Sequence, residues 1–205
     1  MDRIVIADDH PLFRAALATA LARAAPGAAI EETDSLAGAR AALAAGAVDL
    51  LLLDLKLSDS EGFAGLASIR ADFPTAPVAI VSASDDAGTI RRALAFGAAG
   101  FIPKSATLSA MVEALEAILA GDVWAPAVSG EAPAGSMEAR IANLTPSQLK
   151  ILIGLQQGRL NKQIAFDLGV TEATIKAHLT GVFRKLGVHN RTQAVIAAQA
   201  LTTDL

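Results

Sequence analysis

The sequence lacks cysteine altogether, and aromatic residues make up only 4% of its 205 residues. Without cysteine, disulfide bonds, thiolate zinc sites and cysteine nucleophiles are excluded. Long hydrophobic runs are also missing, because no apolar stretch approaches the ~18 to 20 residues that span a bilayer. The acidic pair Asp8 and Asp9 follows the first methionine too closely for a secretory signal to be completed before it. We therefore expect a soluble, cytoplasmic protein with no membrane partner.

The apolar content is high although long runs are absent. Hydrophobic residues make up 53% of the chain and charged residues 19%. This composition allows a buried core and excludes a disordered or collagen-like chain. The charge is uneven: residues 1–125 hold 9 basic and 16 acidic residues, a net charge of −7, whereas residues 126–205 hold 8 and 5, a net charge of +3. The acidic part suits binding of a cation, and the basic part suits binding of a polyanion.

Short strand-like runs alternate with longer helical stretches in the acidic part. The expected strands are Ile4–Ala7, Ala29–Thr33, Leu50–Leu53, Val78–Val81 and Gly100–Ile102. The expected helices lie near 11–25, 35–45, 61–72, 86–96 and 107–119. This alternation predicts an α/β fold in which a doubly wound parallel sheet is covered on both faces. The order of the strands does not follow from the periodicity.

The basic part shows no strand pattern. Thr145 and Gln148 have the spacing of a capping box, with Pro146 at the first helical position. Helices are expected at about 146–157, 161–168, 172–186 and 191–201. The second and third of them are separated by a short turn that contains Gly169, which is the spacing of a helix-turn-helix.

Reactive side chains follow four of the five expected strands. They are Asp8, Asp9, Asp54, Ser82 and Lys104. Because the carboxyl ends of parallel strands meet at one edge of a sheet, we expect these groups to lie together. Carboxylates in such a cluster repel one another unless a hard cation binds there, and Mg²⁺ suits their oxygen ligands. The set predicts attack by a carboxylate on phosphorus, with the metal and the lysine neutralising the transferred group.

Residues 3 to about 120 resemble the receiver domain of two-component response regulators, which has a flavodoxin-like fold with five parallel strands. The resemblance implies a function for each matched residue. Asp54 matches the phosphoacceptor, Asp8 and Asp9 the magnesium-binding acids, Lys56 the backbone carbonyl that binds the metal, and Ser82, Phe101 and Lys104 the switch residues. The chain departs from the family at Ser58, where proline is common, and around Lys104, which follows Pro103 and precedes Ser105.

Plainer interpretations of some of these residues stay open. Asp8 and Asp9 could cap the first helix, and Phe101 could be a core aromatic. We expect His10 at the surface or in a helix cap, and not as a ligand.

The helix expected at 172–186 has two distinct faces. Its buried stripe comprises Ile175, Leu179, Val182, Phe183 and Leu186. Its outward residues are Glu172, Ala173, Lys176, Ala177, Thr180 and Arg184. Small and basic side chains on one face allow close approach to the major groove of DNA.

Residues 143 to about 201 resemble the LuxR-type, or NarL/FixJ-type, DNA-binding domain. The matching segments are Leu144–Gln148, Asn161–Ala165, Thr174–Leu179, Lys185–Val188 and Asn190–Thr192. The resemblance implies that Lys176, Ala177 and Thr180 read bases, and that Lys162, Thr174 and His178 contact the DNA backbone. Gln148 stands where the family usually has glutamate. We accordingly predict a receiver at 1–120, a linker at 121–142 and a four-helix DNA-binding domain at 143–205.

The leading hypothesis is a transcriptional response regulator and not an enzyme. A sensor histidine kinase would phosphorylate Asp54, and phosphorylation would control homodimerisation and binding to double-stranded DNA. A phosphohydrolase with Asp54 as nucleophile would require a general acid two residues later, where the chain has Lys56. The third hypothesis is a phosphorylation-independent DNA-binding regulator whose receiver is a dimerisation module.

Overall fold

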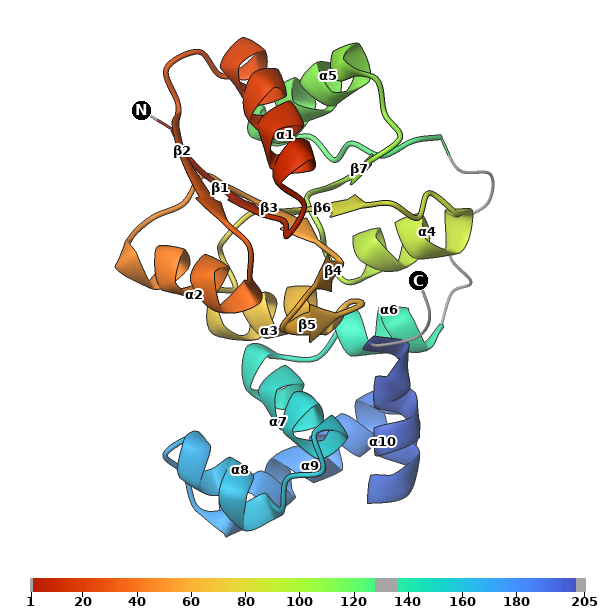
Figure 1. Ribbon diagram of the computed structural model, residues 1–205. Helices are drawn as coiled ribbons and strands as arrows, with labels where there is room; N and C mark the ends of the chain where they lie inside the picture. The colour runs from red at the N-terminus through yellow and green to blue at the C-terminus, as the bar shows by residue number, and fades with distance from the viewer. Residues whose placement is uncertain (1, 128–135, 202–205) are drawn as a thin grey trace.

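Five parallel strands form the centre of the N-terminal half of the chain in a computed structural model that describes residues 2–127 and 136–201. The strands are β1 (Arg3–Ala7), β2 (Ala29–Thr33), β3 (Leu50–Asp54), β6 (Val78–Ser82) and β7 (Gly100–Pro103). They lie in the order β2-β1-β3-β6-β7 (Figure 1). The central strand β3 is buried along its whole length, as its unbroken apolar run Leu50–Leu53 predicts. The parallel, doubly wound fold is therefore confirmed.

Helices cover both faces of this sheet (Figure 1). Helices α1 (Pro11–Ala24) and α5 (Leu108–Leu119) lie on one face, and α2 (Leu36–Ala45), α3 (Ala64–Asp72) and α4 (Ala87–Ala95) lie on the other. Three of these helices begin at a residue whose side-chain oxygen accepts a hydrogen bond from a backbone amide of the first turn, which stabilises the helix start. These residues are Ser35, Asp86 and Thr107.

A short hairpin follows β3 and was not predicted. Strands β4 (Lys56–Leu57) and β5 (Ser60–Glu61) pair antiparallel. Each has two residues, which is too short for an alternating pattern to be detected. The hairpin delays the next helix, α3, to Ala64, whereas the sequence placed its start near residue 61.

The C-terminal part consists of helices. They are α6 (Met137–Ala142), α7 (Pro146–Gln156), α8 (Asn161–Asp167), α9 (Glu172–Leu186), α10 (Arg191–Ala198) and the 3-10 helix η1 (Gln199–Leu201). The capping box of Thr145 and Gln148 is present at the start of α7. Gly187 ends α9 with a φ of 70°, a left-handed conformation that glycine adopts without strain. Of the predicted apolar stripe, Ile175, Leu179, Val182 and Leu186 are buried, whereas Phe183 is half-buried and packs against the core from its margin.

Helix α6 lies inside the range 121–142 that the sequence assigns to a linker. Six residues form fewer than two turns, so α6 gives little periodic signal. Part of the predicted linker, 128–135, lies outside the described residues. The domain limits themselves stay a prediction.

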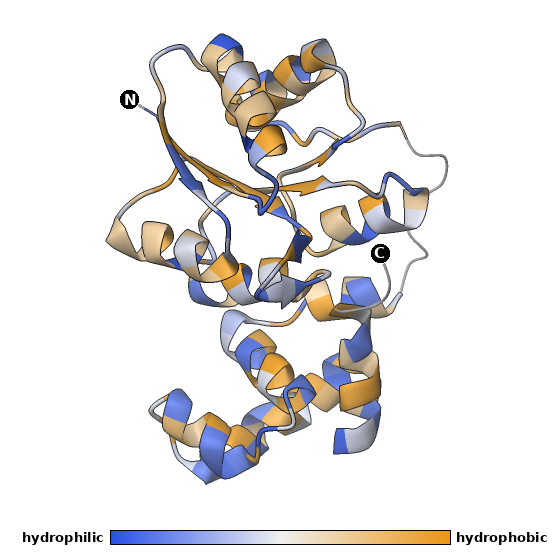
Figure 2. Cartoon of the chain, in the orientation of Figure 1, coloured by the Kyte–Doolittle hydropathy of each residue, from blue (hydrophilic) through white to orange (hydrophobic). Residues whose placement is uncertain are grey.

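The two halves of the chain share a continuous apolar core. Helix α3 packs on α7, and α4 packs on α6. Asp72 of α3 forms ion pairs with Arg40 of α2 and, at 2.7 Å, with Lys150 of α7. Figure 2 shows the middle strands of the sheet in hydrophobic colours, as expected for a buried sheet. Within the described ranges, no helix combines the length and apolar character needed to cross a membrane.

Candidate functional site

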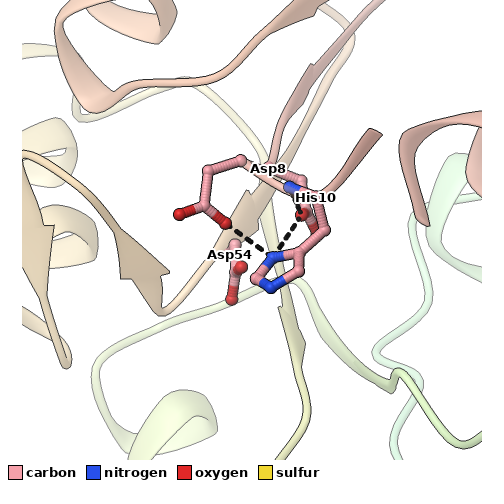
Figure 3. Close-up of side chains that lie close together, drawn as sticks. Asp8, His10 and Asp54 are labelled. Atoms are coloured by element: carbon pink, nitrogen blue, oxygen red, sulfur yellow. Dashed lines mark hydrogen bonds and ion pairs between the residues drawn. The ribbon is translucent and has the colours of Figure 1, made fainter. Parts of the chain in front are cut away.

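Three carboxyl groups and one imidazole meet at the carboxyl edge of the sheet. Asp8 follows β1 and is 1% exposed, and Asp54 ends β3 and is 5% exposed. One ligand atom from each of Asp8, Asp9, His10 and Asp54 can be chosen so that all four lie within 4.8 Å of one another. Figure 3 shows the side chains of Asp8, His10 and Asp54 gathered at one point. The predicted acids therefore lie together at the carboxyl edge of the sheet, as expected for residues that follow parallel strands.

Lys104 joins the two buried acids. Its Nζ lies 2.7 Å from Asp8 Oδ2 and 2.7 Å from Asp54 Oδ2. The ring of Phe13 lies below this ammonium group, with its centre 5.0 Å from Nζ. The Lys104 contact with Asp8 Oδ2 is an ion pair without hydrogen-bond geometry, and this buried oxygen accepts no hydrogen bond among the described residues. One lysine for three carboxylates and a buried oxygen without a donor are features that fit a divalent cation.

Burial raises the pKa of Asp54 above its usual value, since it removes the carboxylate from water. Opposing effects come from Lys104, which donates a hydrogen bond, and from the Lys56 backbone amide, which donates to Asp54 Oδ1 at 3.0 Å. The nearby Asp8 adds to the rise in pKa. A cation at this edge would favour the charged form of Asp54, which is the form that can act as a nucleophile.

The two remaining predicted switch residues differ in their surroundings. Ser82 ends β6 and is buried, and its Oγ accepts a hydrogen bond from the Ser84 amide at 3.1 Å. Strand register pairs Ser82 with Pro103, which directly precedes Lys104. Phe101 is 0% exposed and belongs to the apolar core on the opposite side of β7 from Ile102. Its position matches the core-aromatic interpretation.

Helices α8 and α9 carry the residues expected to contact DNA. Lys176, Ala177 and Thr180 are exposed on α9, and Lys162 is exposed on α8. Thr174 and His178 are half-buried. Lys176 forms an ion pair with Glu172 at 3.1 Å, one turn earlier on the same helix. The helix therefore presents small side chains beside a basic one, as predicted.

An arginine that the sequence analysis quoted only as part of a motif fixes the position of α8. Arg191, at the start of α10, donates hydrogen bonds to Asn161 Oδ1 at 3.1 Å and to the Arg159 carbonyl at 2.5 Å. These contacts span 30 and 32 residues of sequence, so helical periodicity gives no signal for them.

Comparison with known families accounts for both halves of the chain. Residues 4–116 match the response regulator receiver domain, and residues 142–198 match the bacterial regulatory proteins of the luxR family. The chain belongs to the LuxR-type response regulators. Its receiver carries the acid edge, and its luxR-type part carries α8 and α9. It is thus a DNA-binding transcriptional response regulator.

Relatives of this LuxR-type regulator match over nearly its full length. The glycerol metabolism activator of Pseudomonas putida is 40% identical, covering 97% of this chain and 95% of that protein. The probable transcriptional regulatory protein NarL of Mycobacterium tuberculosis (strain ATCC 25618 / H37Rv) is 34% identical, covering 96% and 93%. The crystal structure of a LuxR family DNA-binding response regulator from Silicibacter pomeroyi is 35% identical with a TM-score of 0.54, covering 62% of this chain and 98% of that one.

A more distant structure shares the fold. The structure of two RcsB dimers bound to two parallel DNAs has a TM-score of 0.57 and 20% identity, and it covers 98% of this chain and 99% of that one. At this identity the similarity shows the fold of the LuxR-type regulator and nothing finer.

One residue of this regulator, His10, makes a contact that the sequence did not predict. His10 is exposed and occupies the position before α1, as expected, but its side chain makes no capping hydrogen bond. Instead, its Nδ1 lies 2.6 Å from Asp9 Oδ1. The sequence signal was the adjacency of His10 to the acid pair.

Proposed function

We propose that Asp54 accepts a phosphoryl group from the phosphohistidine of a sensor kinase, and that phosphorylation controls homodimerisation and DNA binding. The observation that carries this proposal is the convergence of buried Asp54, buried Asp8 and Lys104 at 2.7 Å from both. In the transfer, an oxygen of Asp54 forms a bond to phosphorus while the bond between phosphorus and the histidine nitrogen breaks. Lys104 is positioned to pair with an oxygen of the transferred group.

The proposed metal is Mg²⁺, held by Asp8, Asp9, Asp54 and the backbone carbonyl of Lys56. When bound, Mg²⁺ supplies positive charge to the phosphoryl oxygens. The buried Asp8 oxygen without a hydrogen-bond donor supports a cation here. Ser82 is proposed to bind the phosphoryl group after transfer, and Phe101 to respond to that movement. The receiver acts by binding and switching, so we assign it no catalytic turnover of a separate substrate.

The test is incubation with acetyl phosphate and Mg²⁺ followed by intact-mass measurement. Wild-type protein should gain one phosphoryl group, and Asp54→Ala should gain none. Ser58→Ala, which alters an exposed hydroxyl of the β4–β5 hairpin, is the matched control and should behave as wild type. Incorporation into Asp54→Ala that is insensitive to EDTA would show that the acceptor is another residue.

We also propose specific roles on the DNA side. Lys176, Ala177 and Thr180 face base edges in the major groove, while Lys162, Thr174 and His178 contact the DNA backbone. A single recognition helix buries little surface, so specific binding favours a dimer on paired half-sites. We also propose a cytoplasmic location, because a protein that binds chromosomal DNA must reach it there. Sedimentation of phosphorylated protein on a selected operator should show two chains per site, and a strict monomer would contradict the dimer.

One observation favours the second candidate, DNA binding without phosphorylation. The receiver packs on α6 and α7, while the outward residues of α9 are exposed to solvent in the part of the chain that the structure describes. Operator affinity of Asp54→Ala against phosphorylated wild type distinguishes the two candidates. Equal affinities would support the second candidate.

A further inference from the structure

His10 faces the acid cluster although solvent is open to it. Its side chain is 67% exposed, yet Nδ1 lies 2.6 Å from Asp9 Oδ1 and 3.4 Å from Asp8 Oδ1 (Figure 3). The same region of space receives an oxygen of Asp54. An imidazole nitrogen is therefore the fourth potential ligand atom of the cluster, and the only one that is not an oxygen.

The backbone around His10 fixes this arrangement. The His10 amide donates a hydrogen bond to Asp8 Oδ1 at 2.8 Å, and Arg14 donates one to the Asp8 carbonyl at 2.6 Å. His10 is extended, with φ −96° and ψ 103°, as the residue before a proline usually is. Pro11 then starts α1, so the chain cannot turn the His10 backbone into the helix. These contacts keep His10 beside the acids.

We propose that His10 supplies an imidazole ligand to the cation site of Asp8, Asp9 and Asp54, so that the site takes an imidazole-preferring transition-metal ion such as Ni²⁺ as well as Mg²⁺. This inference rests on the proposed function, which places a divalent cation at these acids. Neutral imidazole suits nickel, zinc and copper, whereas magnesium prefers oxygen ligands and retains water. His10 would thus strengthen binding of Ni²⁺ far more than binding of Mg²⁺.

The alternative is that His10 only forms a surface ion pair with Asp9. Both interpretations place Nδ1 beside the carboxylate, but they differ in what the removal of the imidazole changes. A surface ion pair would give no selective effect on one metal. A ligand would alter the ratio of Ni²⁺ to Mg²⁺ affinity.

The first measurement is isothermal titration of tag-free, full-length protein with Ni²⁺ and with Mg²⁺. Even indirect partners of metal ligands contribute 10- to 100-fold to affinity, so we expect His10→Gln to weaken Ni²⁺ binding by at least ~10-fold. Mg²⁺ affinity should stay within about twofold, because Mg²⁺ can retain a water in that position. The chain contains three histidines, and His189→Gln, which lies outside both the acid cluster and the proposed DNA contacts, is the matched control that should leave both affinities unchanged.

The second measurement detects the bond itself. Electron spin-echo envelope modulation of the Mn²⁺-loaded protein should show a directly coordinated ¹⁴N nucleus. The signal should disappear in His10→Gln and persist in His189→Gln. Absence of ¹⁴N coupling in wild type, or an unchanged Ni²⁺ to Mg²⁺ ratio in His10→Gln, overturns the inference.

Together with the phosphorylation test, these two measurements distinguish failure of the His10 proposal from failure of the proposed function. If Mg²⁺ binds and supports phosphorylation of Asp54 while His10→Gln has no metal-selective effect, only the role of His10 is wrong. If wild type binds neither metal and Asp54 gains no phosphate, the proposed cation site fails as well.

Discussion

At the scale of single residues, burial of the Asp54 carboxyl group makes the free energy of unfolding depend on pH. Burial raises its pKa, so the folded protein holds its proton more tightly than the unfolded chain does. Between the ordinary value of 3.8 and the raised value, the free energy of unfolding therefore falls as pH increases. At neutral pH without a divalent cation, the charged carboxylate destabilises the fold.

A substitution that removes this charge should stabilise the metal-free protein. We expect Asp54→Asn to raise the free energy of unfolding at pH 7 by on the order of 1 kcal/mol, a size common for changes at functional sites. The difference from wild type should shrink as pH falls below 3.8, where Asp54 is neutral in both states. Denaturant titrations of both proteins at several pH values measure this difference in the free energy of unfolding. Asp49→Asn, at an acid outside the cluster, is the comparison, and a destabilised Asp54→Asn would contradict the prediction.

At the scale of secondary-structure elements, the proposed DNA contacts assign base recognition to α9 and contact with the DNA backbone to α8. Lys176 is 66% exposed in its side chain and is held by Glu172 in the free protein. Removing Lys176 should cost roughly 1 to 3 kcal/mol on the specific site and relax base preference at one position. Removing Lys162 should weaken binding to all sequences alike and lower the salt slope by ~1.

Titrations of Lys176→Ala and Lys162→Ala against operator and random duplexes, at several salt concentrations, measure both effects. If Lys176→Ala weakens both duplexes equally while Lys162→Ala changes sequence preference, the assignment of the two helices is reversed.

The Arg191 contacts connect the starts of α8 and α10. Arg191→Ala removes hydrogen bonds to Asn161 and Arg159, and we expect the free energy of unfolding of the C-terminal helices to fall by about 1 to 2 kcal/mol. Hydrogen exchange should become faster in α8 while exchange in the receiver sheet stays the same. Arg184→Ala, at an exposed position of α9, is the control. Unchanged exchange in α8 would show that these bonds do not hold the helix.

The sequence was sufficient to predict the sheet and the acid cluster, but not the strand order, the β4–β5 hairpin or the contacts of His10. The alternation of strand and helix patterns, the buried run of β3 and the polar residues after four of the five strands were sufficient to predict the sheet and the acid edge. Strand order depends on contacts between distant segments, which no local pattern records. The β4–β5 hairpin was too short to detect, and the orientation of His10 depends on carboxylates that only the fold brings together.

At the scale of the whole molecule, the receiver and the DNA-binding helices are joined by α3 and α7. Lys150 and Arg40 hold the pKa of Asp72 below its usual value, although partial burial acts in the opposite direction. Because the folded pKa is lowered, the stabilisation from Asp72 is present above pH 3.8 and is lost as pH falls through the lowered value.

Breaking the ion pair between the two halves should loosen their packing. We expect Lys150→Met to increase the radius of gyration measured by small-angle X-ray scattering and to speed hydrogen exchange in α3 and α7, with high salt giving the same trend in wild type. Lys162→Met, on α8, keeps the same change in charge without a contact to Asp72 among the described residues. An unchanged radius in Lys150→Met would mean that apolar packing alone holds the halves together.

Strand β2 forms a charged, open edge of the sheet. It lies at an edge of the sheet, so one side of its backbone has no neighbouring strand in the described structure. Its exposed Glu31 and Glu32 are held by Arg3 and Arg14. A second copy that added its own β2 here would bring like charges together, which disfavours edge-to-edge polymerisation. The charges on β2 therefore protect this edge of the sheet against pairing with the same edge of a second copy, which is the first step of edge-to-edge aggregation.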